Sequence, residues 1–292
     1  MELNIDRLTK QYKNKIAVDR VSFVFTKGVY GLLGANGAGK TTLMRMLCGI
    51  LKPTSGGVSF NGTDVSHEDY RDVLGYLPQD FGYYPDFTAM EFLCYMGSLK
   101  GLPKQRSKEK GKELLDIVAL TGMANKKIKT FSGGMKQRLG IAQSLINNPK
   151  ILILDEPTAG LDPKERVRFR NLISRLGADR IVLLSTHIVS DVENIAGTIL
   201  VMKEGQLICS GSLKEIIKVI DHRVFECIAD IEDAEKLAKA YTVINIRPEN
   251  GKAYFRMVCD KEPCENSKPV PATLEDLYLY YFSEVNENAK LL

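Results

Sequence analysis

A chain of 292 residues, of which 44% are hydrophobic and 26% charged, has the composition of a folded protein with room for one large domain and a smaller one. The net charge of +4 is scattered along the chain, so we expect no nucleic acid as a partner. No apolar run reaches the roughly 20 residues that span a bilayer, the N-terminus lacks a secretory signal, and the six cysteines form no Cys-x-x-Cys pair, which together favour a cytoplasmic protein with ordinary thiols.

The first segment predicts a pair of antiparallel strands. Residues 2–9 and 20–26 alternate apolar and polar side chains on either side of Asn14-Lys15. Short β-rich runs that are apolar on both faces then recur at Val29–Leu33, Ile151–Leu154 and Ile181–Leu184. Such runs are typical of a parallel sheet covered by helices on both sides, so we expect an α/β domain.

A glycine-rich loop follows the first of these runs. Residues 34–42, GANGAGKTT, match the pattern G-x-x-x-x-G-K-[ST] between a strand and a helix, the context in which that pattern holds a nucleotide phosphate. Three glycines permit positive φ and let backbone N–H groups converge on phosphate oxygens: Gly34, Gly37 and Gly39. Lys40 is expected to reach the β and γ phosphates, and the Thr41 hydroxyl to bind Mg²⁺. A chance glycine turn is the alternative.

The pattern changes to helix between about Asp86 and Gly122. Thr88-x-x-Glu91 is a capping box that opens the segment MEFLCYMGSL, and Glu113–Leu120 has the apolar spacing of a helix. This segment therefore predicts a helical insert in the α/β domain.

The segment FSGGMKQR, Phe131–Arg138, predicts a second anion site. Ser132 can cap a helix, and Gly133 and Gly134 expose the first amides of that helix. One chain thus carries one phosphate loop and one spare anion site.

Polar side chains follow two of the buried runs. Asp155 and Glu156 come directly after Ile151–Leu154, at the sheet edge where ligands bind in open α/β folds. Asp155 is placed to hold Mg²⁺ through water, and Glu156 to orient or deprotonate the water that attacks the γ phosphate. Ser185, Thr186 and His187 bring a third polar group to the same edge. The alternatives are a solvated acidic strand end and a structural histidine.

The remaining chain predicts a hairpin and a second domain. Thr198–Met202 and Gln206–Cys209 flank Glu204-Gly205 as a hairpin, and Ser212-x-x-Glu215 caps a short helix that ends near Ile220. From Arg223 onward we expect a strand at Val224–Ile228 and a helix at Ala234–Ala240. Two strands around Glu249-Asn250-Gly251 and a helix at Leu274–Phe282 should follow. We therefore expect domains at 1–220 and 221–292, the second a small α+β domain.

Taken in order, these motifs closely resemble those of the ATP-binding cassette (ABC) family over about residues 1–220. The resemblance implies a P-loop ABC ATPase domain with a RecA-like core, an antiparallel β subdomain and a helical subdomain at about 86–146. It also implies that two cassettes pair head to tail, so that Ser132 and Gly134 of one copy clamp the γ phosphate held by Lys40 of the other. Phe131 and Met135 depart from the usual leucine and glutamine, and neither change removes a phosphate donor.

The resemblance assigns a role to each matching residue. The nucleotide contacts it implies are Tyr12 stacked on adenine, Gly34, Asn36, Gly37, Ala38, Gly39, Lys40, Thr41 and Thr42, with Ser132, Gly133 and Gly134 from the paired cassette. Implied catalytic residues are Glu156, His187, Gln79 and Lys40, the implied Mg²⁺ ligands are Thr41, Gln79 and Asp155, and Asp162 lies at the dimer seam. A core tyrosine and a loop glutamine are the alternatives for Tyr12 and Gln79.

The implied function is ATP hydrolysis that drives a separate integral membrane permease. The cofactors would be ATP and Mg²⁺, the assembly a homodimer or a paired cassette, and the location the inner face of the cell membrane. The C-terminal sequence PATLEDLYLYYF resembles cassettes of antibiotic-resistance and bacteriocin-immunity export systems, which favours export, although an amphipathic helix closing the small domain is the alternative. Two rival functions remain: a soluble cassette acting on DNA, ribosomes or iron–sulfur assembly, and a regulatory dimer without a pore.

Overall fold

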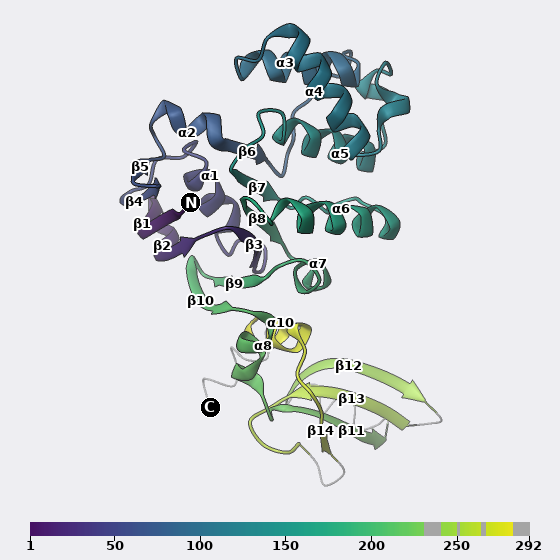
Figure 1. Ribbon diagram of the computed structural model, residues 1–292. Coiled ribbons are helices and arrows are strands. Elements are labelled where there is room, and N and C mark those ends of the chain that lie inside the picture. Colours follow the sequence, from purple (N-terminus) through teal and green to yellow (C-terminus); the bar gives the residue numbers. More distant parts are fainter. Residues whose placement is uncertain (231–240, 250–251, 264–266, 283–292) are drawn as a thin grey trace. The chain divides into compact units, whose positions relative to one another are not determined.

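The computed structural model describes residues 1–230, 241–249, 252–263 and 267–282 (Figure 1). The chain divides into two compact units, Met1–Ile208 and Cys209–Leu292. The domain boundary expected between residues 220 and 221 stays a prediction. Among the described residues, no helix combines the length and the hydropathy that a membrane span requires.

A six-stranded sheet forms the centre of the first unit, in the order β10-β9-β3-β8-β7-β6. Its strands are β3 (Gly28–Leu33), β6 (Leu74–Leu77), β7 (Ile151–Asp155), β8 (Ile181–Thr186), β9 (Thr198–Lys203) and β10 (Gln206–Gly211). β3 pairs in parallel with β8 and β9, and β7 pairs in parallel with β6 and β8. Every residue of β7 and β8 is buried, which confirms the predicted parallel sheet with both faces covered. The carboxyl ends of β3, β7 and β8 therefore meet at one edge.

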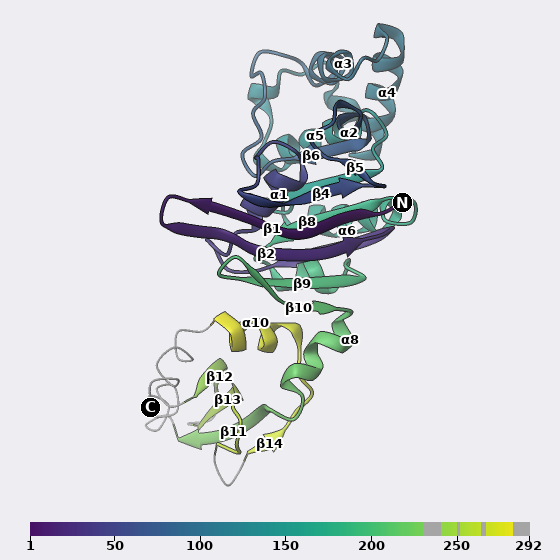
Figure 2. The same ribbon diagram turned by 90° about the vertical axis from the view of Figure 1, so that its left-hand side faces the viewer.

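A second, antiparallel sheet packs against the first, in the order β2-β1-β4-β5. Its strands are β1 (Leu3–Tyr12), β2 (Lys15–Phe25), β4 (Ser55–Phe60) and β5 (Thr63–Asp64). The predicted strand pair is thus confirmed, although β1 continues to Tyr12 and β2 begins at Lys15, because the turn between them takes only two residues. Figure 2 shows this sheet lying in front of the strands of the parallel sheet.

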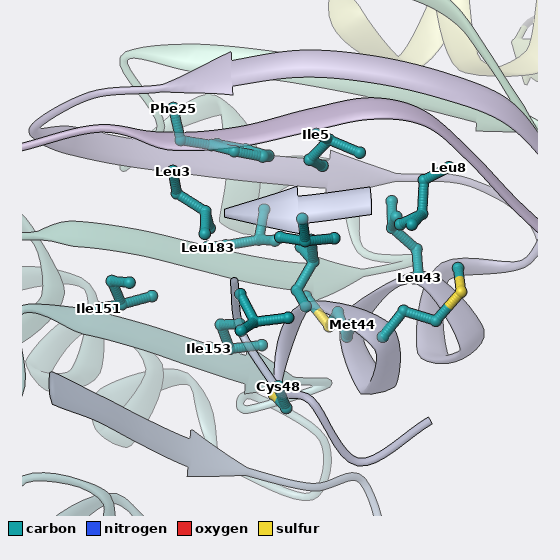
Figure 3. Close-up of a cluster of buried hydrophobic side chains, with 14 of the residues drawn as sticks. Leu3, Ile5, Leu8, Phe25, Leu43, Met44, Cys48, Ile151, Ile153 and Leu183 are labelled. Carbon is teal, nitrogen blue, oxygen red and sulfur yellow. The ribbon is translucent and has the colours of Figure 1, made fainter. Parts of the chain in front are cut away.

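The helices of the first unit cover its sheets and form one end of the unit. They are α1 (Lys40–Leu47), α2 (Glu68–Val73), α3 (Ala89–Leu99), α4 (Lys104–Ile117), α5 (Gly133–Ser144), α6 (Pro163–Leu176) and α7 (Val189–Glu193), with 3-10 turns η1 (Thr121–Met123) and η2 (Ile128–Thr130). In Figure 1, α6 and α7 lie on one face of the parallel sheet, while α1 and the antiparallel sheet lie on the other. Figure 3 shows the hydrophobic core that α1 and the antiparallel sheet form with the parallel sheet. Its apolar side chains come from β1, β2, α1, β7 and β8: Leu3, Ile5, Leu8, Phe25, Leu43, Met44, Ile151, Ile153 and Leu183.

The helical insert has the predicted beginning but a different second helix. Thr88 and Glu91 form the expected capping box, in which each side chain bonds the backbone N–H of the other at 3.2 and 2.8 Å. The expected helix at Glu113–Leu120 was wrong in both bounds, since α4 runs from Lys104 to Ile117. Its first turns present few large apolar residues, which hid the helical period, and the positive φ of Ala119 (54°) follows the helix end.

The second unit contains a four-stranded antiparallel sheet in the order β12-β13-β11-β14. Its elements are α8 (Leu213–Ile216), η3 (Ile217–Ile220), β11 (Val224–Asp230), β12 (Thr242–Glu249), β13 (Lys252–Val258), β14 (Lys268–Pro269) and α10 (Leu274–Phe282). The capping box at Ser212 and Glu215, the first strand and the last helix are confirmed. The expected helix at Ala234–Ala240 lies outside the described residues.

Candidate functional site

The phosphate loop lies between β3 and α1, as the sequence predicted. Gly37 and Gly39 have φ of +83° and +105°, the left-handed backbone that favours glycine. Gly34, which also permits positive φ, does not adopt it. Gly34 is needed for a different reason, since a Cβ there would collide with the carbonyl oxygen of Met202 in β9. The loop is thus held against the neighbouring strand.

Lys40 folds back over this loop. Its Nζ donates hydrogen bonds to the carbonyl oxygens of Gly34 at 2.7 Å and Ala35 at 3.1 Å. Burial lowers the pKa of Lys40, and the nearby carboxylates of Glu156 and Asp155 oppose that shift. The ammonium group therefore sits inside the curve of the loop, where a phosphate would be bound.

A cavity of about 450 Å³ opens beside the loop. Its lining is Tyr12, Lys15, Ala17, Asn36, Gly37, Gly39, Lys40, Thr41, Thr42, Gln79 and Glu156. Nine of these are predicted site residues, and they come from the end of β1, the phosphate loop, the segment after β6 and the end of β7. Lys15 and Ala17 were missed, because their place in the cavity depends on the β1–β2 turn and not on a local motif. Gly34, Ala38, Asp155 and His187 lie outside the lining.

The two carboxylates at the end of β7 are held in different ways. Asp155 is fully buried; its Oδ1 accepts a hydrogen bond from Ser185 at 2.5 Å, and its Oδ2 has no partner among the described atoms. Glu156 has a φ of +52°, which is uncommon for a non-glycine residue, and its Oε2 lies 2.9 Å from Nδ1 of His187. The Glu156 side chain is 8% exposed and that of His187 is 51% exposed, so the pair faces the solvent side of the sheet edge.

The segment predicted to form a second anion site lies at the start of α5. The Ser132 hydroxyl accepts a hydrogen bond from the Met135 N–H at 3.2 Å, which confirms the predicted cap. Ser132 and Gly133 are exposed, whereas Gly134 packs so closely on Glu165 that a Cβ would collide with that carboxylate. Glu165 also pairs with Arg138 at 2.9 Å. Nothing in the sequence marked this ion pair, since its partners lie on two different helices.

The structure does not place the three signature residues in the cavity that Lys40 lines. The side chain of Gln137, three residues further along α5, does reach the carbonyl oxygen of Glu156 with a long hydrogen bond of 3.4 Å. Asp162 caps α6 by accepting from the Glu165 N–H at 2.8 Å and is itself exposed. Its role at a dimer seam stays a prediction.

The chain resembles ABC ATPases in sequence and in fold. The family model for ABC transporters matches residues 18–159. An uncharacterised ABC transporter ATP-binding protein of Bacillus subtilis, YxlF, is 43% identical over 76% of this chain and 75% of its own length. The Nod factor export ATP-binding protein I of Burkholderia thailandensis is 35% identical over 95% of each chain. A dimeric ATP-binding cassette with bound ADP and Pi superposes with a TM-score of 0.67 at 26% identity, covering 72% of this chain and 98% of that structure. The chain therefore belongs to the ATP-binding proteins of ABC transporters, and its activity is ATP hydrolysis.

Proposed function

We propose that this ATPase powers export through a separate integral membrane permease, working in the cytoplasm as a peripheral subunit on the inner face of the cell membrane. Two relatives support export: the Nod factor export protein, whose similarity spans 95% of both chains, and a linearmycin resistance ATP-binding protein of Bacillus subtilis, 35% identical over 73% of this chain. The family relationship favours this function over a soluble cassette acting on DNA, ribosomes or iron–sulfur assembly.

The loop residues would bind the nucleotide. The backbone N–H groups of the loop (Gly34, Asn36, Gly37, Ala38, Gly39) and the side chains of Lys40, Thr41 and Thr42 would hold the phosphates at the N-terminus of α1. Lys40 would exchange its hydrogen bonds to two loop carbonyls for bonds to the β and γ phosphates. Tyr12, which lines the cavity and is 47% exposed, would stack on adenine.

The same edge fits Mg²⁺, since the buried Oδ2 of Asp155 lacks a hydrogen-bond partner among the described atoms. Hard oxygen ligands suit this ion, and we propose that Thr41, Gln79 and Asp155 hold it, directly or through water. When bound, it would neutralise charge on the phosphate oxygens.

Glu156 would act as the general base. Its carboxylate lines the cavity that Lys40 also lines, and the hydrogen bond to His187 fixes its direction, so that it can accept a proton from the attacking water. His187, which is half exposed, would contact the γ phosphate as well. This constellation at the end of β7 is the observation that carries the proposed mechanism.

A second cassette would complete the site. Ser132, Gly133 and Gly134 line no part of the cavity around Lys40, yet the first two expose the positive end of α5 to solvent. We propose that they bind the γ phosphate held by a paired cassette, in a homodimer or a heterodimer, with Asp162 at the seam. ATP binding would close this dimer, and hydrolysis would open it.

Glu156→Gln tests the catalytic assignment in the full chain. ATP binding should be retained, turnover should fall by roughly 10²- to 10⁴-fold, as expected for loss of a general base, and an ATP-bound dimer should accumulate in size-exclusion chromatography. Glu193→Gln, an exposed glutamate of α7, makes the same charge change outside the cavity and should turn over normally. Near-normal hydrolysis by Glu156→Gln would remove that residue from its role.

Recovery from membranes tests the transport assignment. The tagged chain, expressed with the membrane protein encoded beside it, should co-purify with that protein after detergent extraction and should hydrolyse ATP faster in the complex. Recovery only in the soluble fraction, with no integral partner, would favour the regulatory dimer instead.

A further inference from the structure

The hydroxyl group of Ser185 joins the two carboxylate residues at the end of β7. Asp155 and Ser185 face each other in the parallel register of β7 and β8, and both are fully buried. Ser185 Oγ donates to Asp155 Oδ1 at 2.5 Å and accepts from the Glu156 backbone N–H at 3.0 Å. One side chain thus contacts both a proposed Mg²⁺ ligand and the backbone of the proposed general base, while lining no part of the cavity itself.

The contact to Asp155 sets the direction of its carboxylate. Because Oδ1 is tied to Ser185 by a short, charge-assisted hydrogen bond, Oδ2 is the oxygen left without a partner among the described atoms. Removing the hydroxyl would leave Oδ1, like Oδ2, without a hydrogen-bond partner among the described atoms in a fully buried carboxylate. The carboxylate would then lose the interaction that selects its orientation.

The contact to Glu156 supports an unusual backbone. The Glu156 N–H is shared between the Ser185 hydroxyl and the Ser185 carbonyl oxygen, at 3.0 and 3.2 Å. Glu156 itself has left-handed φ, a conformation that persists in a non-glycine residue only when its surroundings hold it. His187 holds the other end of the same residue, through the carboxylate.

We propose that Ser185 is a positioning residue for ATP hydrolysis: its hydroxyl sets the Asp155 carboxylate for Mg²⁺ and fixes the Glu156 backbone at the same time. This inference rests on the proposed roles of Asp155 and Glu156. The sequence showed only that a polar residue ends β8 at this edge.

The test compares Ser185→Ala and Ser185→Cys with the unmodified full chain. ATP affinity is measured with a fluorescent ATP analogue in EDTA and during a Mg²⁺ titration, and turnover is measured over the same titration. In Ser185→Ala the ATP affinity in EDTA should stay within about twofold of that of the parent. The Mg²⁺ concentration that gives half-maximal turnover should rise, and the maximal turnover rate should fall, each by about 10- to 100-fold. The thiol of Ser185→Cys is a weaker donor of similar size, so its values should lie between those of serine and alanine.

Ser107→Ala is the matched control. Ser107 is also fully buried, in α4, and donates to a backbone carbonyl, that of Leu102. The Mg²⁺ dependence of Ser107→Ala should not change, since Ser107 lines no part of the cavity around Lys40 and its hydroxyl contacts neither Asp155 nor Glu156.

Two outcomes would overturn the inference. One is an unchanged Mg²⁺ dependence in both Ser185 variants; if the alanine variant does not fold, the cysteine variant decides alone. The other is a loss of affinity in EDTA equal to the loss in Mg²⁺, which would indicate a general structural role. Glu156→Gln, assayed in parallel, distinguishes failure of the proposed mechanism from failure of the Ser185 inference. Normal turnover of Glu156→Gln would refute the proposed mechanism. An inactive Glu156→Gln beside unaffected Ser185 variants would refute the inference about Ser185 alone.

Discussion

Asp276 joins α10 to β13 in the second unit through Arg256, and its replacement by asparagine provides a stringent test. The carboxylate is fully buried at the start of α10. Arg256 of β13 donates to it twice, from Nε at 2.9 Å and from Nη2 at 2.8 Å, and Thr273 donates its N–H at 2.7 Å and its hydroxyl at 2.8 Å. Asparagine would keep one acceptor and turn an amide donor toward these donors.

The expected cost follows from these contacts. Breaking a buried ion pair by removing one partner typically costs about 3–5 kcal/mol. Arg256 is 22% exposed and keeps contacts to Glu226 and to the Pro271 carbonyl, so the low end, about 3 kcal/mol, is appropriate. For a domain of roughly 60–100 residues, each kcal/mol lowers the melting temperature by about 4–8 °C. The second unit should therefore melt about 12–24 °C earlier.

Calorimetry of the full chain measures this shift. ATP should raise the transition of the first unit, which carries the phosphate loop, so the transition that ATP leaves unchanged belongs to the second unit. Glu275→Gln, one residue earlier and exposed, makes the same charge change without these contacts and should melt like the parent chain. A melting temperature of Asp276→Asn equal to that of Glu275→Gln would refute the reasoning.

Two further predictions concern the first unit. Tyr12→Ala should weaken ATP binding by about 1–3 kcal/mol, or about 5- to 150-fold, the usual range for loss of a base-stacking ring, while Tyr12→Phe should bind normally. Equal affinity of both variants and the parent would exclude stacking. The capping hydrogen bond from the Thr88 backbone lowers the pKa of Glu91 below its ordinary value of 4.5. A lowered folded-state pKa contributes stability above pH 4.5 that is lost as the pH falls through the lowered value. Glu91→Gln should therefore be less stable than the parent in thermal unfolding near pH 7, and the difference should vanish in acid; a deficit independent of pH would contradict this assignment.

Features that depend on neighbouring residues could be predicted from the sequence. Both capping boxes, at Thr88 and Ser212, and the Ser132 cap need only a hydroxyl and partners about three residues further along, so the pattern specifies the geometry. The buried strands were recognised because runs that are apolar on both faces have few alternatives of that length.

Features that depend on distant residues could not. Gly34 was predicted for the site because glycine permits positive φ, whereas the structure shows a different constraint, its close approach to the Met202 carbonyl, far along the chain in β9. The position of β3 between β8 and β9 follows from tertiary packing, and no local sequence pattern specifies the contacts between these strands. Lys15 and Ala17 enter the cavity in this way.

The distinction between local and distant contacts also applies to the candidate site. The groups predicted to bind phosphate lie in two contiguous segments, the loop at residues 34–42 and the start of α5, so each could be recognised from the sequence alone. How the two segments act together could not be predicted in this way, because the cavity around Lys40 contains none of the three signature residues. A single chain thus has the groups to bind ATP at one place and the predicted anion site at another. If the exposed amides of α5 act on ATP, they act on a nucleotide bound elsewhere, and the hydrolysis rate should rise more steeply than linearly with protein concentration while the chain is mostly monomeric.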